Sequence, residues 1–329
     1  MNQDYRFEDL KNWLSDAIDK PIKAISPASM DASFRRYFRV FISDQNSYIA
    51  VDSPPKYEDS MKFVNIASLM EAMSIKVPKI LATNFQEGFM LISDLGAETM
   101  LNAIHQEEAK AQELYAESID ILLKMQINGS KHVENLPVFS KELLIDEMHL
   151  FLDWFCLRHL RIHPEIIEDH YFGEIFEKLS EHALDQKQVF VHRDFHSRNI
   201  LLSQQGDMGI IDFQDAVAGP ITYDLVSLLK DCYISLTSSK IDYWVDFYFG
   251  RLADFELIDR DYEQFRMDFD LMGVQRHLKA IGIFSRLKYR DKKDTYVFDI
   301  PRTINYIYAT AKQHPFLEPL HQFINKYVY

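Results

Sequence analysis

The stretch VFVHRDFHSRNILLSQQGDMGIIDF, from Val189 to Phe213, decides how this chain folds. Its first residues are β-branched and apolar, and they predict a short strand that leads into a polar loop. Two further apolar runs, Ile200–Leu202 and Met208–Ile211, stand on either side of the turn sequence QQGD and predict a hairpin. Asn199 and Asp212 lie at the two open ends of this hairpin, so we expect it to bring them to the same end of a sheet.

The polar residues of this stretch match the spacing H-R-D-x-x-x-x-N followed by Asp-Phe. In kinase-like enzymes that spacing supplies a catalytic base and two magnesium ligands. Phosphoryl transfer needs an acceptor hydroxyl in line with the phosphate, and it needs Mg²⁺, which prefers oxygen ligands, to offset the phosphate charge. We therefore predict that Asp194 is the base for an acceptor hydroxyl, and that Asn199 and Asp212 hold Mg²⁺ on ATP.

The same residues allow other interpretations. His192 also fits a buried histidine that braces the loop, and the carboxylates also fit turn caps. His192, Asp194 and His196 alternate in a way that suits zinc, with Asp212 or Asp215 completing a hydrolase site. The zinc interpretation leaves the asparagine and the hairpin without a role, so phosphoryl transfer is the favoured hypothesis.

Length and composition are typical of a two-lobed enzyme. The 329 residues exceed what one hydrophobic core usually serves, and 47% hydrophobic with 13% aromatic residues argues against disorder. The net charge of -14 argues against binding to nucleic acid or to an anionic membrane. We find no secretory signal, no apolar run of membrane-spanning length and, with two cysteines, no disulfide framework. We expect a cytoplasmic protein with no obligate protein partner.

Apolar periodicity predicts the order of the elements. An amphipathic helix opens the chain, strands and one helix follow, and helical patterns dominate after residue 96. The strands are expected over residues 34–42, 47–51, 80–83 and 89–93, and the helices over 57–73, 108–127, 140–160, 165–182 and beyond 222. The fold class is therefore α+β: a bilobal, protein-kinase-like fold with a small N-terminal sheet lobe, 1–95, and a larger, mainly helical C-terminal lobe, 96–329, that contains the hairpin.

Six strings give the chain a family resemblance. They are DASFRRYFRV at 31–40, VDSPPKYED at 51–59, GFMLISDLG at 88–96, LFLDWFCLRHL at 150–160, HRDFHSRN at 192–199 and IIDFQDAVAGPITYDLVSLLKD at 210–231. The chain resembles the aminoglycoside phosphotransferase and choline kinase superfamily, and within it the bacterial anomeric kinases of N-acetylmuramate and N-acetylglucosamine. The resemblance implies a sugar kinase that uses ATP and Mg²⁺ to phosphorylate the C1 hydroxyl of an amino sugar during peptidoglycan recycling.

The resemblance also implies roles for residues outside the hairpin. The N-terminal lobe would bind the nucleotide through a covering loop over 31–36 and a hinge over 93–95. The residues expected to bind the nucleotide are Ser33, Arg35, Arg36, Ser93, Asp94 and Leu95. Those expected to face the sugar are Asp153, Trp154, Arg158, His196 and Asp215. Tyr223 and Asp224 would brace the segment after Asp212.

The chain departs from the protein-kinase pattern in its N-terminal lobe. It has no Gly-rich loop, and Asp52 occupies the place of the lysine that ends the V-A-I-K strand. An anion there would repel phosphate unless it points away or binds metal, so we expect the positive charge to come from Arg35, Arg36 or Arg39, with Lys56 behind them. Arginine suits this role because its planar fork binds two phosphate oxygens. The competing expectation is that these arginines meet carboxylates on the outer face of the strand.

Other functions remain open from the sequence. The apolar run around Asp153 and Arg158 predicts a buried helix face, where these two charges either pair with each other or bind substrate. The acceptor could instead be an aminoglycoside, choline or a protein serine, and the acidic surface would suit a cationic aminoglycoside. A nucleotide-binding regulator without turnover is the third hypothesis, since the strand lysine is missing, although the intact trio of Asp194, Asn199 and Asp212 argues against it.

Overall fold

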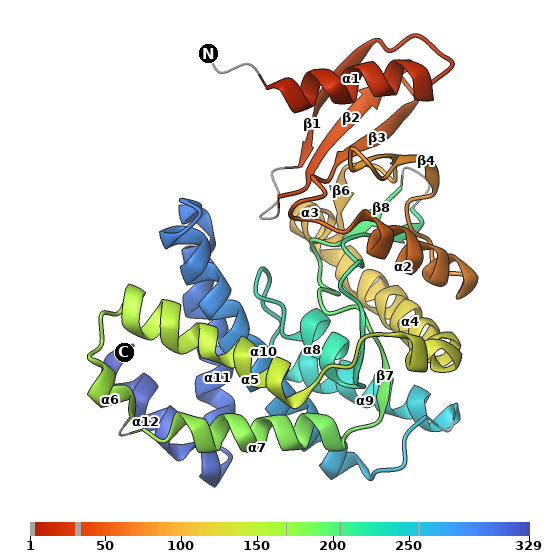
Figure 1. Cartoon of the computed structure of the whole chain (residues 1–329). Helices are drawn as coiled ribbons and strands as arrows, with labels where there is room; N and C mark the ends of the chain where they lie inside the picture. Colours follow the sequence, from red (N-terminus) through yellow and green to blue (C-terminus); the bar gives the residue numbers. More distant parts are fainter. Residues whose placement is uncertain (1–3, 30–33, 169, 204–205, 256) are drawn as a thin grey trace. The chain divides into compact units, whose positions relative to one another are not determined.

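The computed structural model describes residues 4–29, 34–168, 170–203, 206–255 and 257–329. The chain forms two compact units (Figure 1). The first comprises Met1–Gln106 together with Asn199–Asp215, and the second comprises Glu107–Arg198 together with Ala216–Tyr329. The expected first lobe was 1–95, whereas this unit extends to Gln106 and also includes a segment from the middle of the chain.

An antiparallel sheet forms the first part of unit one. Its strands are β1 (Ala24–Ser29), β2 (Arg36–Phe41), β3 (Ser47–Asp52), β4 (Ile80–Asn84) and β5 (Phe89–Ser93), in the order β1-β2-β3-β5-β4. Helix α1 (Tyr5–Ala17) covers one face, where Leu10 and Leu14 pack with Val40, Ala50 and Leu91. Helix α2 (Ser60–Ala72) begins at Asp59, whose carboxylate accepts the N–H of Met61 at 2.9 Å.

The predicted hairpin is confirmed, but it belongs to the first unit. Its strands are β8 (Ile200–Leu202) and β9 (Met208–Ile210), and β8 also pairs with β6 (Glu98–Thr99), which precedes α3 (Met100–Gln106). The N–H of Ile210 donates to the carbonyl of Lys76 at 2.8 Å, and Phe213 packs on Phe63 of α2 with ring centroids 4.8 Å apart. These contacts to earlier parts of the chain explain why the hairpin joins the first unit and not the helical one.

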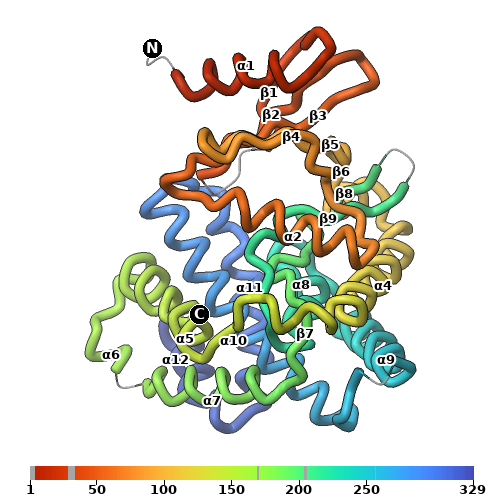
Figure 2. The backbone as a smooth tube through the Cα atoms, turned by 45° about the vertical axis from the view of Figure 1, so that its right-hand side comes forward, coloured from red at the N-terminus to blue at the C-terminus, as the bar shows by residue number. Residues whose placement is uncertain are grey.

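The second unit is mainly helical and is built around the long helix α10 (Tyr262–Tyr289), which packs against α5, α7, α8 and α11 (Figure 2). Its other helices are η1 (Glu108–Lys110), α4 (Ala111–Gly129), η2 (Ser130–Asn135), α5 (Lys141–Leu150), η3 (Phe151–His159), α6 (Pro164–Glu168), α7 (Phe172–Asp185), α8 (Tyr223–Leu229), α9 (Ser238–Asp254), η4 (Asp294–Asp299), α11 (Ile300–Ala311), η5 (Pro315–Leu317) and α12 (Glu318–Tyr327). Strands β7 (Gln188–Val191) and β10 (Val217–Pro220) form an antiparallel pair. No helix of the described part is long and apolar enough to cross a membrane.

The structure corrects several predicted elements. The helix expected over 140–160 changes after Leu150 from an α-helix to the π-helix η3. A side chain at Gly282 of α10 would lie 2.3 Å from the backbone of Leu150, so glycine permits the close approach of the two helices at this junction. The helix expected over 165–182 is two helices, with Tyr171 in the left-handed region at φ 51° between them. Strand β1 was not predicted, because its Pro27 is unfavourable in a central strand; here β1 is an edge strand with a bulge.

Candidate active site

The loop after β7 carries the predicted base, Asp194. The buried carboxylate of Asp224, on α8, accepts the backbone N–H groups of His192 at 2.6 Å and Arg193 at 3.0 Å. Arg193 lies in the left-handed region with φ 77°, a conformation that non-glycine residues adopt only when their surroundings impose it. Asp224 therefore holds the loop that presents Asp194. The brace on the segment after Asp212 stays a prediction for Asp224.

Buried ion pairs also hold the loop that carries Asp194. Glu147 of α5 forms ion pairs with Arg193 of the loop and, at 2.9 Å, with Lys279 of α10. Lys279 also donates to the hydroxyl of Tyr223 at 3.1 Å. Burial raises the pKa of Glu147, but the charges of Lys279 and Arg193 outweigh burial and hold this pKa below its ordinary value. The glutamate therefore stays ionised between two cations.

Asp194 lines a small pocket within the second unit. The pocket is bounded by Asp194, His196, Tyr223, Cys232, Tyr233, Arg276, Lys279, Ala280, Ile283 and Phe284. Burial raises the pKa of Asp194, yet the charges of Lys279, His196 and Arg276 bring it below its ordinary value. Burial lowers the pKa of His196, the charges of Asp231 and Asp194 raise it, and the balance lies below its ordinary value. The pocket is thus lined by an ionised carboxylate, the form of Asp194 that can accept a proton.

The predicted metal ligands come together within the first unit. The side-chain amide of Asn199 lies 3.4 Å from a carboxylate oxygen of Asp212, and Gln214 donates to the other oxygen at 2.9 Å. Asp212 has a left-handed φ of 63°, which aspartate tolerates better than most residues. Carboxylate and amide oxygens are the donors that Mg²⁺ prefers, so this pair fits that ion. The zinc interpretation finds no such support: among the described residues, no three His, Cys, Asp or Glu side chains group as metal ligands.

Two of the predicted phosphate-binding arginines are held by carboxylates. Asp52, fully buried in the lysine position, forms ion pairs with Arg6 of α1 and Arg36 of β2, and the latter also pairs with Asp4. Arg39 binds Asp94 through Nε at 2.6 Å. The structure therefore places Arg36 and Arg39 in ion pairs of the sheet, as in the competing expectation.

Arg35 is also paired with a carboxylate, that of Glu58, but it is more deeply buried than Arg36 and Arg39. It is 4% exposed and donates to Glu58 at 2.9 Å. Burial lowers the pKa of its guanidinium, but Tyr37, Glu58 and Asp212 together raise it above its ordinary value. Of the three arginines, Arg35 is thus the one whose charge interacts with the predicted metal ligand. Ser33, the other residue expected in this loop, lies outside the described residues.

The predicted hinge joins β5 to the segment before β6. Asp94 accepts from Ser47 at 2.7 Å and from the N–H of Gly96 at 2.9 Å, besides its pair with Arg39. Ser93 accepts the N–H of Lys79 on its hydroxyl at 2.9 Å. These side chains therefore serve the local structure.

The Leu95 side chain approaches Gly209 of β9, where any side chain would meet it at 2.7 Å. The backbone over 93–95 stays the predicted contact to adenine.

The predicted sugar-binding residues divide among different environments. Asp153 and Arg158 are both exposed on η3, and they do not pair with each other in the described structure. Trp154, beside them, is half-buried. His196 lines the pocket of Asp194, whereas Asp215 is exposed in the first unit. His196 is the one of these five residues that lines this pocket.

Comparisons with known proteins agree with this arrangement. Residues 24–265 match the model of the family described as "Phosphotransferase enzyme family". The chain belongs to this phosphotransferase family. It is 38% identical to an N-acetylmuramate/N-acetylglucosamine kinase of Pseudomonas aeruginosa, with 97% of this chain and 96% of the relative covered. A protein of the same description from Neisseria meningitidis is 36% identical, with 95% and 93% covered.

Solved structures of distant phosphotransferases share the fold. A choline kinase from Streptococcus pneumoniae has a TM-score of 0.64 at 11% identity, covering 93% of this chain and 99% of its own. An aminoglycoside phosphotransferase with bound ADP has a TM-score of 0.59 at 14% identity, covering 91% and 97%. The predicted protein-kinase-like α+β fold, with a small sheet-rich part and a larger helical part, is confirmed.

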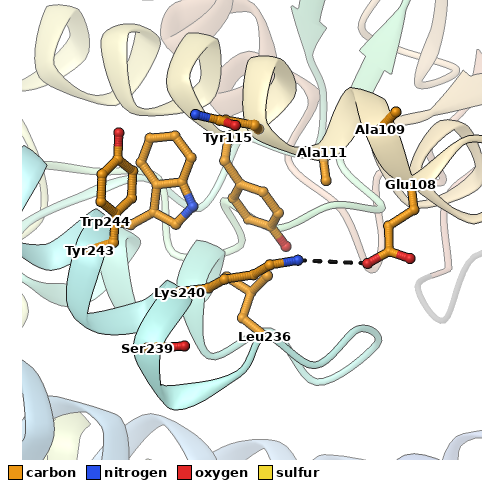
Figure 3. Close-up of a pocket in the computed structure, with 10 residues that line it drawn as sticks. Glu108, Ala109, Ala111, Tyr115, Leu236, Ser239, Lys240, Tyr243 and Trp244 are labelled. Atoms are coloured by element: carbon orange, nitrogen blue, oxygen red, sulfur yellow. Dashed lines mark ion pairs between the residues drawn. The ribbon is translucent and has the colours of Figure 1, made fainter.

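A larger pocket of this phosphotransferase lies elsewhere in the second unit (Figure 3). It has a volume of about 590 Å³ and lies between α4, which contributes Tyr115, and α9, which contributes Trp244. Lys240 and Glu108 form an ion pair of 3.6 Å across it. None of the predicted site residues lines this pocket, so its size alone does not make it the active site.

Sequence reasoning missed the cations and the glutamate around Asp194. Arg276 and Lys279 stand one turn apart in the apolar helix sequence VQRHLKAIGIF, and Glu147 stands in LLIDEMHLF. Charged residues amid apolar ones were the signal that singled out Asp153 and Arg158, and the same signal would have found these three.

Proposed function

We propose that this protein is an ATP- and Mg²⁺-dependent sugar kinase, a phosphotransferase with an alcohol acceptor, that phosphorylates the anomeric hydroxyl of N-acetylmuramate and N-acetylglucosamine. The observation that carries the proposal is near-full-length identity of 36 to 38% to three kinases described by these two sugars. Agreement of the Asp194 loop and the Asn199–Asp212 pair with phosphoryl transfer supports it. Such an enzyme would return amino sugars of the cell wall to metabolism.

Asp194 is the base of the proposed reaction. The C1 hydroxyl donates a hydrogen bond to the Asp194 carboxylate, which is ionised at neutral pH because its pKa is lowered by Lys279, His196 and Arg276 despite burial. A carboxylate of low pKa is a weak base, so the proton moves to Asp194 late, as the bond from the sugar oxygen to the γ-phosphorus forms. The bond from that phosphorus to the ADP oxygen breaks in the same step. Asp194 mainly orients the hydroxyl until then.

Asn199 and Asp212 would hold Mg²⁺, which when bound neutralises the charge of the ATP phosphates. Arg35 supplies a positive charge to the nucleotide side, because it interacts with Asp212 and stays protonated. Ser33 and Arg36 stay predicted nucleotide contacts, with Arg36 also held by Asp52 and Asp4. The backbone over 93–95 binds adenine. His196 is a proposed sugar contact. The other predicted sugar contacts are Asp153, Trp154, Arg158 and Asp215.

The test is a coupled ADP assay of the purified protein with ATP and Mg²⁺ on a panel of acceptors. We expect turnover with N-acetylmuramate and N-acetylglucosamine, and an acid-labile 1-phosphate as the product. Omission of Mg²⁺ should abolish turnover. An aminoglycoside and choline serve as the competing acceptors. Turnover of either of these, with none on an amino sugar, would overturn the proposal.

A further inference from the structure

Arg276 is a buried cation with too few hydrogen-bond partners. It lies in the middle of α10 and is 5% exposed, and it lines the pocket that contains Asp194. Its one hydrogen bond in the described part of the chain runs from Nη1 to the sulfur of Cys232 at 3.8 Å, and its Nε has no partner there. A guanidinium has five N–H donors, and leaving buried donors unmet costs free energy. A ligand in the pocket is the natural acceptor for them.

The carboxylates whose charges raise the pKa of Arg276, despite its burial, are Asp194 in the same pocket and Asp231. Asp231 accepts two hydrogen bonds from Ser197, at 3.0 Å from the backbone N–H and 2.6 Å from the hydroxyl. Across the described ranges of the chain, Arg276 forms no ion pair within 4.0 Å. Its charge is therefore not taken up by a carboxylate of the protein in direct contact.

The pocket is lined by two kinds of side chain. Asp194, His196, Arg276 and Lys279 are polar or charged. Ala280, Ile283 and Phe284 are apolar, and the Phe284 ring lies 6.1 Å from that of Tyr233. Aromatic and apolar surfaces pack against the C–H face of a sugar, while a planar guanidinium binds a carboxylate through two parallel hydrogen bonds. The combination suits a sugar that also carries an anionic group.

We propose that Arg276 binds the carboxylate of the acceptor and thereby selects N-acetylmuramate over N-acetylglucosamine. The inference rests on the proposed function, in which both sugars are phosphorylated at C1. N-acetylmuramate differs by a lactyl ether at O3 that ends in a carboxylate, and N-acetylglucosamine offers only a hydroxyl there. Arg158, the other arginine expected to face the sugar, is exposed on η3. Arg276 is thus a specificity-determining residue.

The test compares kcat/KM for the two sugars in the full-length wild type, Arg276→Gln and a matched control, Arg286→Gln. Arg286 also lies on α10 and is partly buried, but it does not line the pocket. For Arg276→Gln, we expect the preference for N-acetylmuramate to fall about 10- to 100-fold through KM, because a charge-assisted bidentate contact is lost. The control should keep the wild-type preference. An equal loss on both sugars in Arg276→Gln would assign Arg276 to the support of Asp194 and overturn the inference.

A measurement on the wild type keeps the inference testable if Arg276→Gln does not fold. Titration calorimetry without nucleotide compares N-acetylmuramate with its primary amide, which has nearly the same shape but no charge. We expect the amide to bind about tenfold or more weakly. Equal affinity would overturn the role of Arg276. Failure of the proposed function would look different: the wild type would phosphorylate neither sugar, whatever the calorimetric comparison gives.

Discussion

Asp194 is the residue on which the proposed chemistry depends. Replacing it with asparagine keeps the size of the side chain and removes the charge that accepts the proton. We expect Asp194→Asn to lower kcat by about 10²- to 10⁴-fold, the usual contribution of a positioned base, while ATP binding is kept. Steady-state assays with N-acetylmuramate and calorimetry with ATP measure the two quantities. Asp207→Asn, at the exposed turn of the hairpin, is the control and should retain wild-type kcat. Full activity of Asp194→Asn would remove Asp194 from the base role.

Asp212 separates metal binding from proton transfer. Its left-handed backbone makes Asp212→Asn the better variant, because asparagine tolerates that conformation and alanine is strained there. At 100 times its dissociation constant, Mg-ATP should stabilise the wild type by about 2.7 kcal/mol. We expect most of this stabilisation to vanish in Asp212→Asn at the same concentration, and Asp207→Asn to keep it. A thermal shift in Asp212→Asn as large as that of the wild type would exclude Asp212 as a metal ligand.

At the scale of elements, one buried carboxylate ties α1 to the sheet. Asp52 at the end of β3 pairs with Arg6 of α1 and with Arg36 of β2. Asp52→Asn leaves Arg6 without its anion and Arg36 with Asp4 alone, but each arginine is about one-third exposed and can reach water. We therefore expect a loss of about 2 kcal/mol in unfolding free energy, less than for a fully buried pair.

Urea denaturation measures this loss. The control is Asp44→Asn, whose pair with Lys23 is exposed and should contribute less than about 1 kcal/mol. Equal stabilities of Asp52→Asn and Asp44→Asn would show that the Asp52 network does not hold α1. A larger loss for Asp52→Asn would also explain the missing strand lysine. The lysine position would then hold an anion that stabilises the fold, and the positive charge that binds the phosphates would come from other residues.

The whole molecule shows which contacts a sequence can and cannot reveal. The hairpin follows from two short apolar runs and the turn sequence between them. The sequence therefore predicts both the hairpin and the approach of Asn199 to Asp212 at its open end. Arg6 and Asp52 are 46 positions apart, and so are Glu147 and Arg193, so no local pattern links them. Pairing of β8 with β6 is likewise non-local, and it moved the hairpin out of the predicted helical lobe. The residues of the motif could thus be predicted from the sequence, whereas the distant residues that form ion pairs with them could not.

Two buried groups make the stability of the whole molecule depend on pH in opposite directions. Burial raises the pKa of Asp224 from its ordinary 3.8 to about 7, so between these values the folded state binds more protons than the unfolded state. Burial lowers the pKa of His277 from 6.5 to about 3, so between these values the folded state binds fewer. As pH falls from 7 toward 4, Asp224 therefore adds stability and His277 removes it.

Removing each group should reveal its opposing contribution. We expect the stability advantage of the wild type over Asp224→Asn to grow as pH falls from 7.5 to 5, and its advantage over His277→Gln to shrink. Each difference should change by at most about 1.4 kcal/mol per pH unit, the limit for one proton. Urea denaturation at several pH values measures all three proteins, and Asp120→Asn, an exposed carboxylate, should run parallel to the wild type. Parallel curves for Asp224→Asn and the wild type would mean that Asp224 is ionised throughout, and that its two backbone hydrogen bonds outweigh burial.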